Sequence, residues 1–272
     1  MNLRRIISIL TLLSLIILFP GNAGAGNFGM GVHSGYGVIR HSGQTSLSGD
    51  EYRSYSSQDM VIFGVSAEYS FSGPENLYAN ITTDWVAGRE GTETWKRNDA
   101  RVRTTGMRLF AQFYDFRIGC KNSMNNFYYS FYVSGGWDGM RFERDGYVWR
   151  GIPLAGGVEN MHLWRTGAGT GAGYRAGKWA VDWRFAYAWY PAVRVQNSSL
   201  PRFAFNTNGT VLDTGLGLAR QVYRDVNFYF GGSYSLFDIN GSGIIQKDSI
   251  RAVYPGSRIE IIAGMLNLTF AF

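Results

Sequence analysis

The stretch Gly264-Met265-Leu266-Asn267-Leu268-Thr269-Phe270-Ala271-Phe272 decides the fold class that this sequence predicts. Every second residue is bulky and apolar, which places Leu266, Leu268, Phe270 and Phe272 on one face. A period of two residues is typical of a β-strand whose two faces have different surroundings. Because chain ends fray unless something holds them, we expect this strand to be paired, with its apolar face against lipid or a core.

The other end of the chain predicts a secretory signal peptide over residues 1–25. Arg4 and Arg5 precede an apolar run from Ile6 to Phe19, and small residues ending at Ala25 follow it. This order of charged, apolar and small segments is typical of a signal peptide. The apolar run is shorter than the roughly 20 residues of a membrane-spanning helix, which disfavours the alternative of a membrane anchor.

The composition favours a β-barrel for the expected mature domain, residues 26–272. The chain has 16% aromatic residues, 36 glycines and 17% charged residues. Aromatic girdles and closely packed barrel strands use these residue types, whereas a disordered chain would be poor in aromatic residues. The net charge of +6 includes no basic run, so we expect no nucleic-acid partner. Scattered histidines and a single cysteine, Cys120, predict neither a metal site nor a cofactor.

Ten alternating segments lie between turn signals. They are Phe28–Ile39, Val61–Phe71, Leu77–Ala87, Thr104–Phe116, Phe127–Glu143, Met161–Tyr174, Trp179–Tyr190, Val211–Val222, Val226–Phe237 and Arg258–Phe272. The long connections between them are expected to be loops over residues 41–58, 88–101, 146–159, 191–201 and 238–255. Long loops that alternate with short turns are typical of outer-membrane barrels, and a sheet in lipid must close because every backbone group needs a partner.

The sequence therefore predicts an all-β transmembrane antiparallel barrel with ten strands, five long extracellular loops and short periplasmic turns. The last strand, which ends on Phe272, resembles the closing strand of bacterial outer-membrane barrels, which typically end on Phe. We therefore expect the protein in the outer membrane of a Gram-negative bacterium. A soluble β-sandwich also alternates, but it would not keep bulky apolar residues on one face of nearly every strand.

The same alternation assigns charged side chains to the barrel interior. They are His33, Glu68, Asp84, Arg108, Asp138, Asp182 and Arg184. On the fourth segment, Arg108 is expected to face inward, and Met107 and Leu109 to face lipid. Since a ten-stranded barrel is narrow and buried charges need partners, we expect these groups to pair and fill the lumen. The alternative is a reactive group at the outer rim around His33, but no motif marks a serine nucleophile beside it.

Three segments resemble the omptins, the outer-membrane proteases of Gram-negative bacteria. Gly136–Phe142 reads GWDGMRF, at the place where omptins have an aromatic residue followed by an arginine. Gly171–Arg175 reads GAGYR and is similar to the end of their sixth strand, and Trp189-Tyr190 is similar to the aromatic end of the seventh. The ten-strand layout resembles that of omptins over the whole expected mature chain.

The resemblance implies a catalytic water between an Asp pair in the second long loop and an Asp-x-His element in the fourth. Aligning Trp95 with the family puts Thr92 and Thr94 where the Asp pair should lie, while Glu93 points the other way by alternation. The expected fourth loop, residues 191–201, has no His and no Asp. Only weak catalytic candidates remain: Glu93, Asp84, His33 and Asp182.

Lipopolysaccharide binding is the second property that the resemblance implies, through outward cations and an aromatic residue near the outer rim. Trp137 and Arg141 face outward late in the fifth segment, and alternation from Tyr174 places His162 outward on the next. An arginine that faces lipid is costly unless it reaches the headgroups, where its guanidinium matches a phosphate. The alternative is that the Arg141 side chain only extends to the water above the lipid and binds no phosphate.

The sequence thus predicts a non-enzymatic surface barrel that contacts outer-membrane lipid and lipopolysaccharide, with loops that bind an extracellular protein or peptide. Two alternatives remain open. One is an omptin-type endopeptidase with an altered active site, and the other is a narrow pore for small solutes.

Overall fold

A computed structural model of the protein describes residues 27–47, 49–71, 76–149, 152–154, 156–199, 203–247 and 250–272. The predicted signal peptide, residues 1–25, lies outside the described residues.

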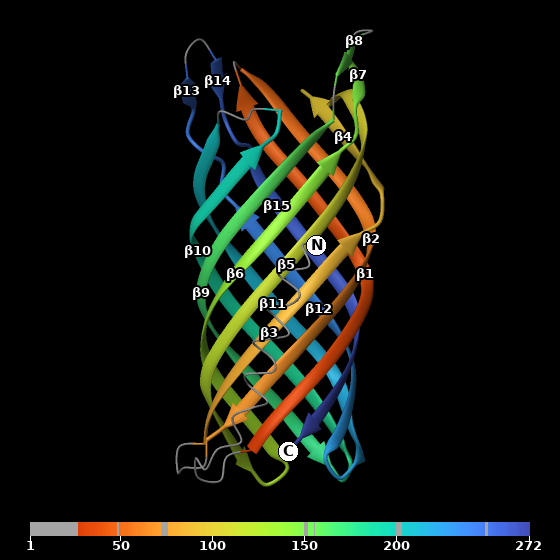
Figure 1. The fold of residues 1–272 in the computed structure, drawn as a ribbon, viewed down its shortest axis with the longest axis vertical. Helices are drawn as coiled ribbons and strands as arrows, with labels where there is room; N and C mark the ends of the chain where they lie inside the picture. Colours follow the sequence, from red (N-terminus) through yellow and green to blue (C-terminus); the bar gives the residue numbers. More distant parts are fainter. Residues whose placement is uncertain are drawn as a thin grey trace, which may run out of the picture.

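The described chain is an antiparallel β-barrel (Figure 1). The strands of its wall are β1 (Asn27–Leu47), β2 (Asp50–Ser70), β3 (Leu77–Gly88), β4 (Gly91–Arg97), β5 (Ala100–Met124), β6 (Phe127–Arg144), β9 (Gly157–Ala176), β10 (Trp179–Asn197), β11 (Ala204–Tyr223), β12 (Val226–Ile239) and β15 (Gly256–Ala271). Pairing of β1 with both β2 and β15 closes the ring. Two short hairpins project from the upper rim: β7 (Tyr147–Trp149) with β8 (Ile152–Leu154), and β13 (Ile245–Lys247) with β14 (Ile250–Ala252).

Eleven strands form the ring, but β3 and β4 follow one another between the same neighbours, β2 and β5. They therefore occupy one position, and the predicted ten-strand layout is confirmed. The β4–β5 hairpin turns at Asn98 and Asp99, whose φ angles are 47° and 66°. A two-residue hairpin of this type needs positive φ at both positions, and Asn and Asp tolerate that conformation better than most residues.

Several predicted loops are paired strands instead. Residues 41–47 and 50–58 continue the β1–β2 ladder, and residues 91–97 form β4. Likewise, β10 runs on to Asn197 rather than ending at Tyr190. Outside lipid, the outer face of a strand is polar, so the apolar alternation that identifies a membrane strand disappears although the backbone pairing continues.

An apolar band covers the outer wall of the lower part of the barrel. Its exposed side chains include Val32, Tyr36, Val61, Phe63, Phe116, Ile118, Phe131, Val133, Trp183, Tyr187, Leu216, Phe230 and Leu266. Further up each strand, the outward positions become charged or polar: Arg40, Asp59, Arg108, Arg141, His162, Arg194, Asp238 and Arg258. The band is the surface that lipid covers, and the strand extensions above it lie outside the membrane. No helix in the described part of the chain is long and apolar enough to cross a membrane.

The interior of the upper half is a packed hydrophobic core. Its fully buried members include Ile39, Met60, Met107, Leu109, Phe142, Met161, Leu163, Tyr190, Val193, Val195, Ile239 and Ile259. The prediction for β5 is therefore wrong: Met107 and Leu109 face inward, while Arg108 is exposed and bonded to Glu90 at 2.5 Å. Apolar residues can face lipid or an internal core, and alternation alone does not say which.

Candidate functional site

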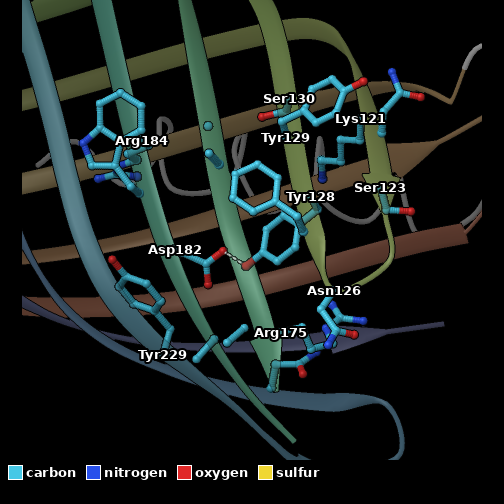
Figure 2. Close-up of a pocket in the computed structure, with 18 of the residues that line it drawn as sticks. Lys121, Ser123, Asn126, Tyr128, Tyr129, Ser130, Arg175, Asp182, Arg184 and Tyr229 are labelled. Atoms are coloured by element: carbon cyan, nitrogen blue, oxygen red, sulfur yellow. Dashed lines mark hydrogen bonds between the residues drawn. The ribbon is translucent and has the colours of Figure 1, made fainter. Parts of the chain in front are cut away.

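The lower half of the lumen contains two adjoining cavities, of about 1170 Å³ and about 540 Å³. Polar side chains from several strands line the larger cavity (Figure 2), where Tyr128 of β6 donates a hydrogen bond to Asp182 of β10. Ile62, Val86 and Phe237 line the second cavity and also belong to the hydrophobic core of the upper half. The core thus closes the lumen on the outer side.

His33 and Asp84 meet in the second cavity. His33 lies on β1 and Asp84 on β3, and the residue between them on β2 is Gly64. Because Gly64 has no side chain, the imidazole Nε2 reaches across β2 to Asp84 Oδ1. Asp182 is hydrogen-bonded to Tyr128 on other strands and does not belong to this pair. Three of the four weak catalytic candidates therefore lie in the lumen, within the membrane band.

A cluster of ion pairs lies where the second cavity meets the core. The guanidinium of Arg165 lies 3.2 Å from Asp115, 3.7 Å from Asp138 and 3.8 Å from Asp213. Tyr190 donates a 2.5 Å hydrogen bond to Asp138. This arrangement confirms that Asp138 faces inward and pairs with a cation, as buried charges require.

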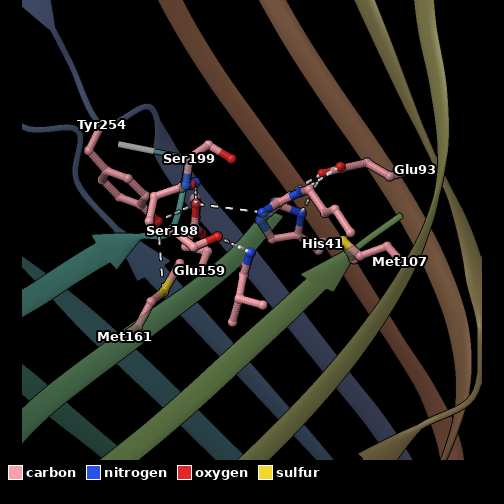
Figure 3. A network of polar contacts seen from close by, with 12 residues as sticks. His41, Glu93, Met107, Glu159, Met161, Ser198, Ser199 and Tyr254 are labelled. Carbon is pink, nitrogen blue, oxygen red and sulfur yellow. Dashed lines mark hydrogen bonds and ion pairs between the residues drawn. The ribbon is translucent and has the colours of Figure 1, made fainter. Parts of the chain in front are cut away.

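Glu93, the fourth candidate, lies in a second polar cluster in the upper half of the barrel (Figure 3). Its carboxylate accepts hydrogen bonds from Arg144 Nε at 2.7 Å and Nη2 at 3.2 Å. Arg144 Nη1 lies 3.6 Å from Glu159 Oε2, and His41 Nδ1 lies 3.8 Å from Glu93 Oε1. Glu93 is completely buried, and Thr92, which the omptin alignment assigns to the site, faces outward.

The electrostatics of this cluster are those of a structural ion pair. Burial lowers the pKa of His41 to about 4. Burial opposes ionisation of Glu93, but the charge and hydrogen bonds of Arg144 outweigh it and hold its pKa below the ordinary value. Burial raises the pKa of Glu159. A general base must reach the proton that it removes from its substrate. Glu93 is buried and accepts two hydrogen bonds from Arg144, so it is not placed to act as one.

Sequence reasoning missed His41, Arg144 and Glu159 because all three were assigned to loops or strand ends. A signal for His41 was present: the inward residues of β1 alternate from His33 through Ile39 to His41. Within the described residues, no three His, Cys, Asp or Glu side chains gather closely enough to hold a metal ion.

The predicted lipopolysaccharide residues lie together on the outer wall, at the upper edge of the apolar band. Trp137 and His162 stack with ring centroids 5.7 Å apart and planes 26° apart. Both line a surface hollow of about 800 Å³, together with Trp164, Pro191 and Arg194. Arg141 lies beside it on β6 and is held by Glu143, with Arg141 Nε 2.7 Å from Glu143 Oε1.

The hollow forms where the pairing of β10 is irregular. The registers of β10 with β9 and with β11 both shift around Pro191, which has no backbone N–H to donate to a ladder. The shift brings Arg194 next to His162, its register partner on β9. Sequence reasoning missed Arg194 because residues 191–201 were predicted to be a loop, and because alternation cannot be extended through a bulge.

No protein-family model matches this sequence. No curated protein matches it either. The structure is similar to the crystal structure of the outer-membrane protease OmpT from Escherichia coli, with a TM-score of 0.69 over 92% of this chain and 99% of that chain, at 10% sequence identity. The translocator domain of the autotransporter NalP from Neisseria meningitidis matches 98% of this chain and 96% of its own, at 15% identity and a TM-score of 0.37.

At 10% identity, the likeness to OmpT shows the fold alone. This chain is an outer-membrane β-barrel of Gram-negative type, with the architecture of an omptin. The predicted omptin-like fold and outer-membrane location are confirmed, and the residues of the expected protease site remain unmatched in the sequence.

Proposed function

We propose that this protein is a non-enzymatic surface barrel that binds lipopolysaccharide at the hollow on its outer wall. The observation that carries the proposal is the combination of Trp137, Trp164, His162 and Arg194 around one hollow, at the level where the apolar band ends.

The chemistry of the hollow fits a lipid with phosphorylated headgroups. Trp164 is 62% exposed, and tryptophan rings favour the boundary between hydrocarbon and headgroups. Arg194 and Arg141 are exposed just above it, where a guanidinium can bind phosphate oxygens in a bidentate manner. The carboxylate of Glu143 orients Arg141 without burying it.

The upper half of the interior supports a non-enzymatic role. His41 and Glu93, a histidine and an acid on the extracellular side, are both buried. Arg144 donates a hydrogen bond to each carboxylate oxygen of Glu93. The hydrophobic core below them fills the lumen, which argues against a pore for solutes.

The experiment compares unfolding midpoints in urea for barrels refolded in lipid vesicles with and without lipopolysaccharide. We expect lipopolysaccharide to stabilise the wild type. Arg141→Ala and Arg194→Ala should each weaken lipopolysaccharide affinity by about five- to tenfold, because each removes a charge-assisted hydrogen bond to phosphate. Dephosphorylated lipopolysaccharide should stabilise all variants less.

Arg40→Ala is the matched control, because Arg40 is an exposed outward arginine on β1, across the ring from the hollow. An unchanged lipopolysaccharide effect in both hollow variants, or an equal loss in Arg40→Ala, would contradict the lipid site. Cleavage of a dibasic fluorogenic peptide above a heat-killed control would contradict the non-enzymatic role.

A further inference from the structure

A cavity of about 610 Å³ opens at the extracellular mouth of the barrel, above the hydrophobic core and apart from the outer-wall hollow. Its volume is within the range of small-ligand sites. The walls come from the upper ends of β1, β2, β4, β5, β6, β9, β10 and β15 and from the segments that follow β10 and precede β15. Hydroxyl and amide groups dominate this lining: Ser54, Asn197, Ser198, Ser199, Tyr254 and Ser257.

Two side chains that line the cavity are buried without hydrogen-bond partners. Both ring nitrogens of His41 and the hydroxyl of Ser54 lack a partner, although each residue is only 3% exposed. The nearest acid to His41 Nδ1 is Glu93 at 3.8 Å, which is too long for a hydrogen bond. Buried polar groups normally have partners, so these atoms point to a ligand that supplies them.

The charges around the cavity cancel. Arg103, Arg144 and Glu159 line it, and Glu93 lies directly behind Arg144. Two arginines therefore face two glutamates, and Arg144 bridges both acids. A cationic peptide or a phosphate would meet no net opposite charge here. The groups left for a ligand are neutral donors and acceptors, next to the aromatic rings of Trp95 and Tyr254.

We propose that this mouth cavity binds an uncharged saccharide unit. Sugar hydroxyls donate and accept hydrogen bonds equally well, which matches the mixed lining and the free atoms of His41 and Ser54. The C–H faces of a sugar ring pack on aromatic side chains such as Trp95. This site and the outer-wall hollow have no lining residue in common, so each proposal can be tested independently of the other.

The test uses the full barrel in an amine-oxide detergent, because maltoside and glucoside detergents would compete. Saturation-transfer NMR and titration compare maltose, lactose, cellobiose and diacetylchitobiose. Glucose, glucosamine and glucuronate form a second series that compares a neutral sugar with a cationic and an anionic analogue. We expect at least one disaccharide to bind with a Kd on the order of 1 mM, and glucose to bind better than its charged analogues.

Two variants locate the site. Ser199→Trp fills the mouth from an exposed position and should abolish saccharide binding. Ser54→Ala removes one hydroxyl and should weaken binding by about fivefold. The control is Ser57→Trp, whose side chain lies on the outer face of the same strand as Ser54 and should leave binding unchanged. Heat-dependent electrophoretic migration verifies that each variant is folded.

The proposal is overturned if no disaccharide binds, if Ser199→Trp binds like the wild type, or if a charged analogue binds best. If deacylated lipopolysaccharide core competes with the bound disaccharide, the natural ligand is a sugar of the surrounding lipopolysaccharide. If only free disaccharides displace it, the natural ligand is a saccharide from outside the cell. Both results support the proposal that the cavity binds a saccharide.

Discussion

His33 and Asp84 are hydrogen-bonded across a strand to which neither belongs. Gly64 makes this contact possible, because a Cβ at this position would overlap both the imidazole and the carboxylate. A glycine inside a strand usually costs stability, so its use here reflects the space that the pair requires.

Gly64→Ala should therefore destabilise the barrel by about 1–3 kcal/mol, since it overpacks a buried site and separates His33 from Asp84. Gly135→Ala is the control, because its nearest neighbour would be the Arg165 carbonyl at 3.9 Å. The control should be neutral or slightly stabilising. Urea unfolding in vesicles measures both, and similar midpoints for the two variants would refute the role of Gly64.

His41 should make the barrel less stable in acid. Its pKa of about 4 in the folded barrel lies below the ordinary value of 6.5, so the unfolded chain binds the proton more readily. The contribution of His41 to the free energy of unfolding is fully present above pH 6.5. It is lost as the pH falls toward 4, by roughly 3 kcal/mol in total. Burial of Glu159 acts in the opposite direction, so the comparison must be made between variants.

His41→Gln should remove this part of the acid sensitivity and give a flatter profile of unfolding midpoint between pH 7 and pH 4. His162→Gln makes the same change on the exposed outer wall and should keep the wild-type profile in detergent without lipopolysaccharide. Parallel profiles for wild type and His41→Gln would show that His41 is not the titrating group.

Arg144 should matter far more to stability than an exposed arginine with a shorter ion pair. Arg144→Met leaves Glu93 and Glu159 buried without their cation, which should cost about 3–5 kcal/mol. Arg108→Met breaks an exposed pair with Glu90 and should cost less than about 1 kcal/mol. Unfolding midpoints of the two variants decide the comparison, and equal losses would mean that water reaches the Arg144 cluster.

The lower cavities should be accessible from the periplasm and closed from outside. In a Cys120→Ser background, Ser66→Cys places a thiol in the second cavity and Ser57→Cys places one on the exposed outer face of β2, above the apolar band. A charged, membrane-impermeant thiosulfonate should modify only Ser57→Cys in intact cells. It should modify both after the outer membrane is permeabilised, because the hydrophobic core blocks the lumen from outside. Labelling of Ser66→Cys in intact cells would reveal an open pore.

The membrane-level assignments on most strands followed from sequence because alternation reports the local surroundings of each residue. On β10, for example, Trp183 and Tyr187 face out, and Asp182 faces the lumen, as predicted. On β5 the same rule gave the wrong face, because Met107 and Leu109 are buried in an internal core rather than in lipid. Hydrophobicity distinguishes buried from wet surfaces, but it does not distinguish lipid from protein.

By itself, the sequence determined the closed barrel, its ten-strand layout and the inward or outward direction of most membrane-level side chains, from Phe272 back to Phe28. These follow from backbone pairing and a period of two residues, which are local properties. Only the tertiary structure decided which side chains meet. Glu93 and Arg144 are 51 positions apart in sequence, and strand tilt and closure of the ring bring them together with His41.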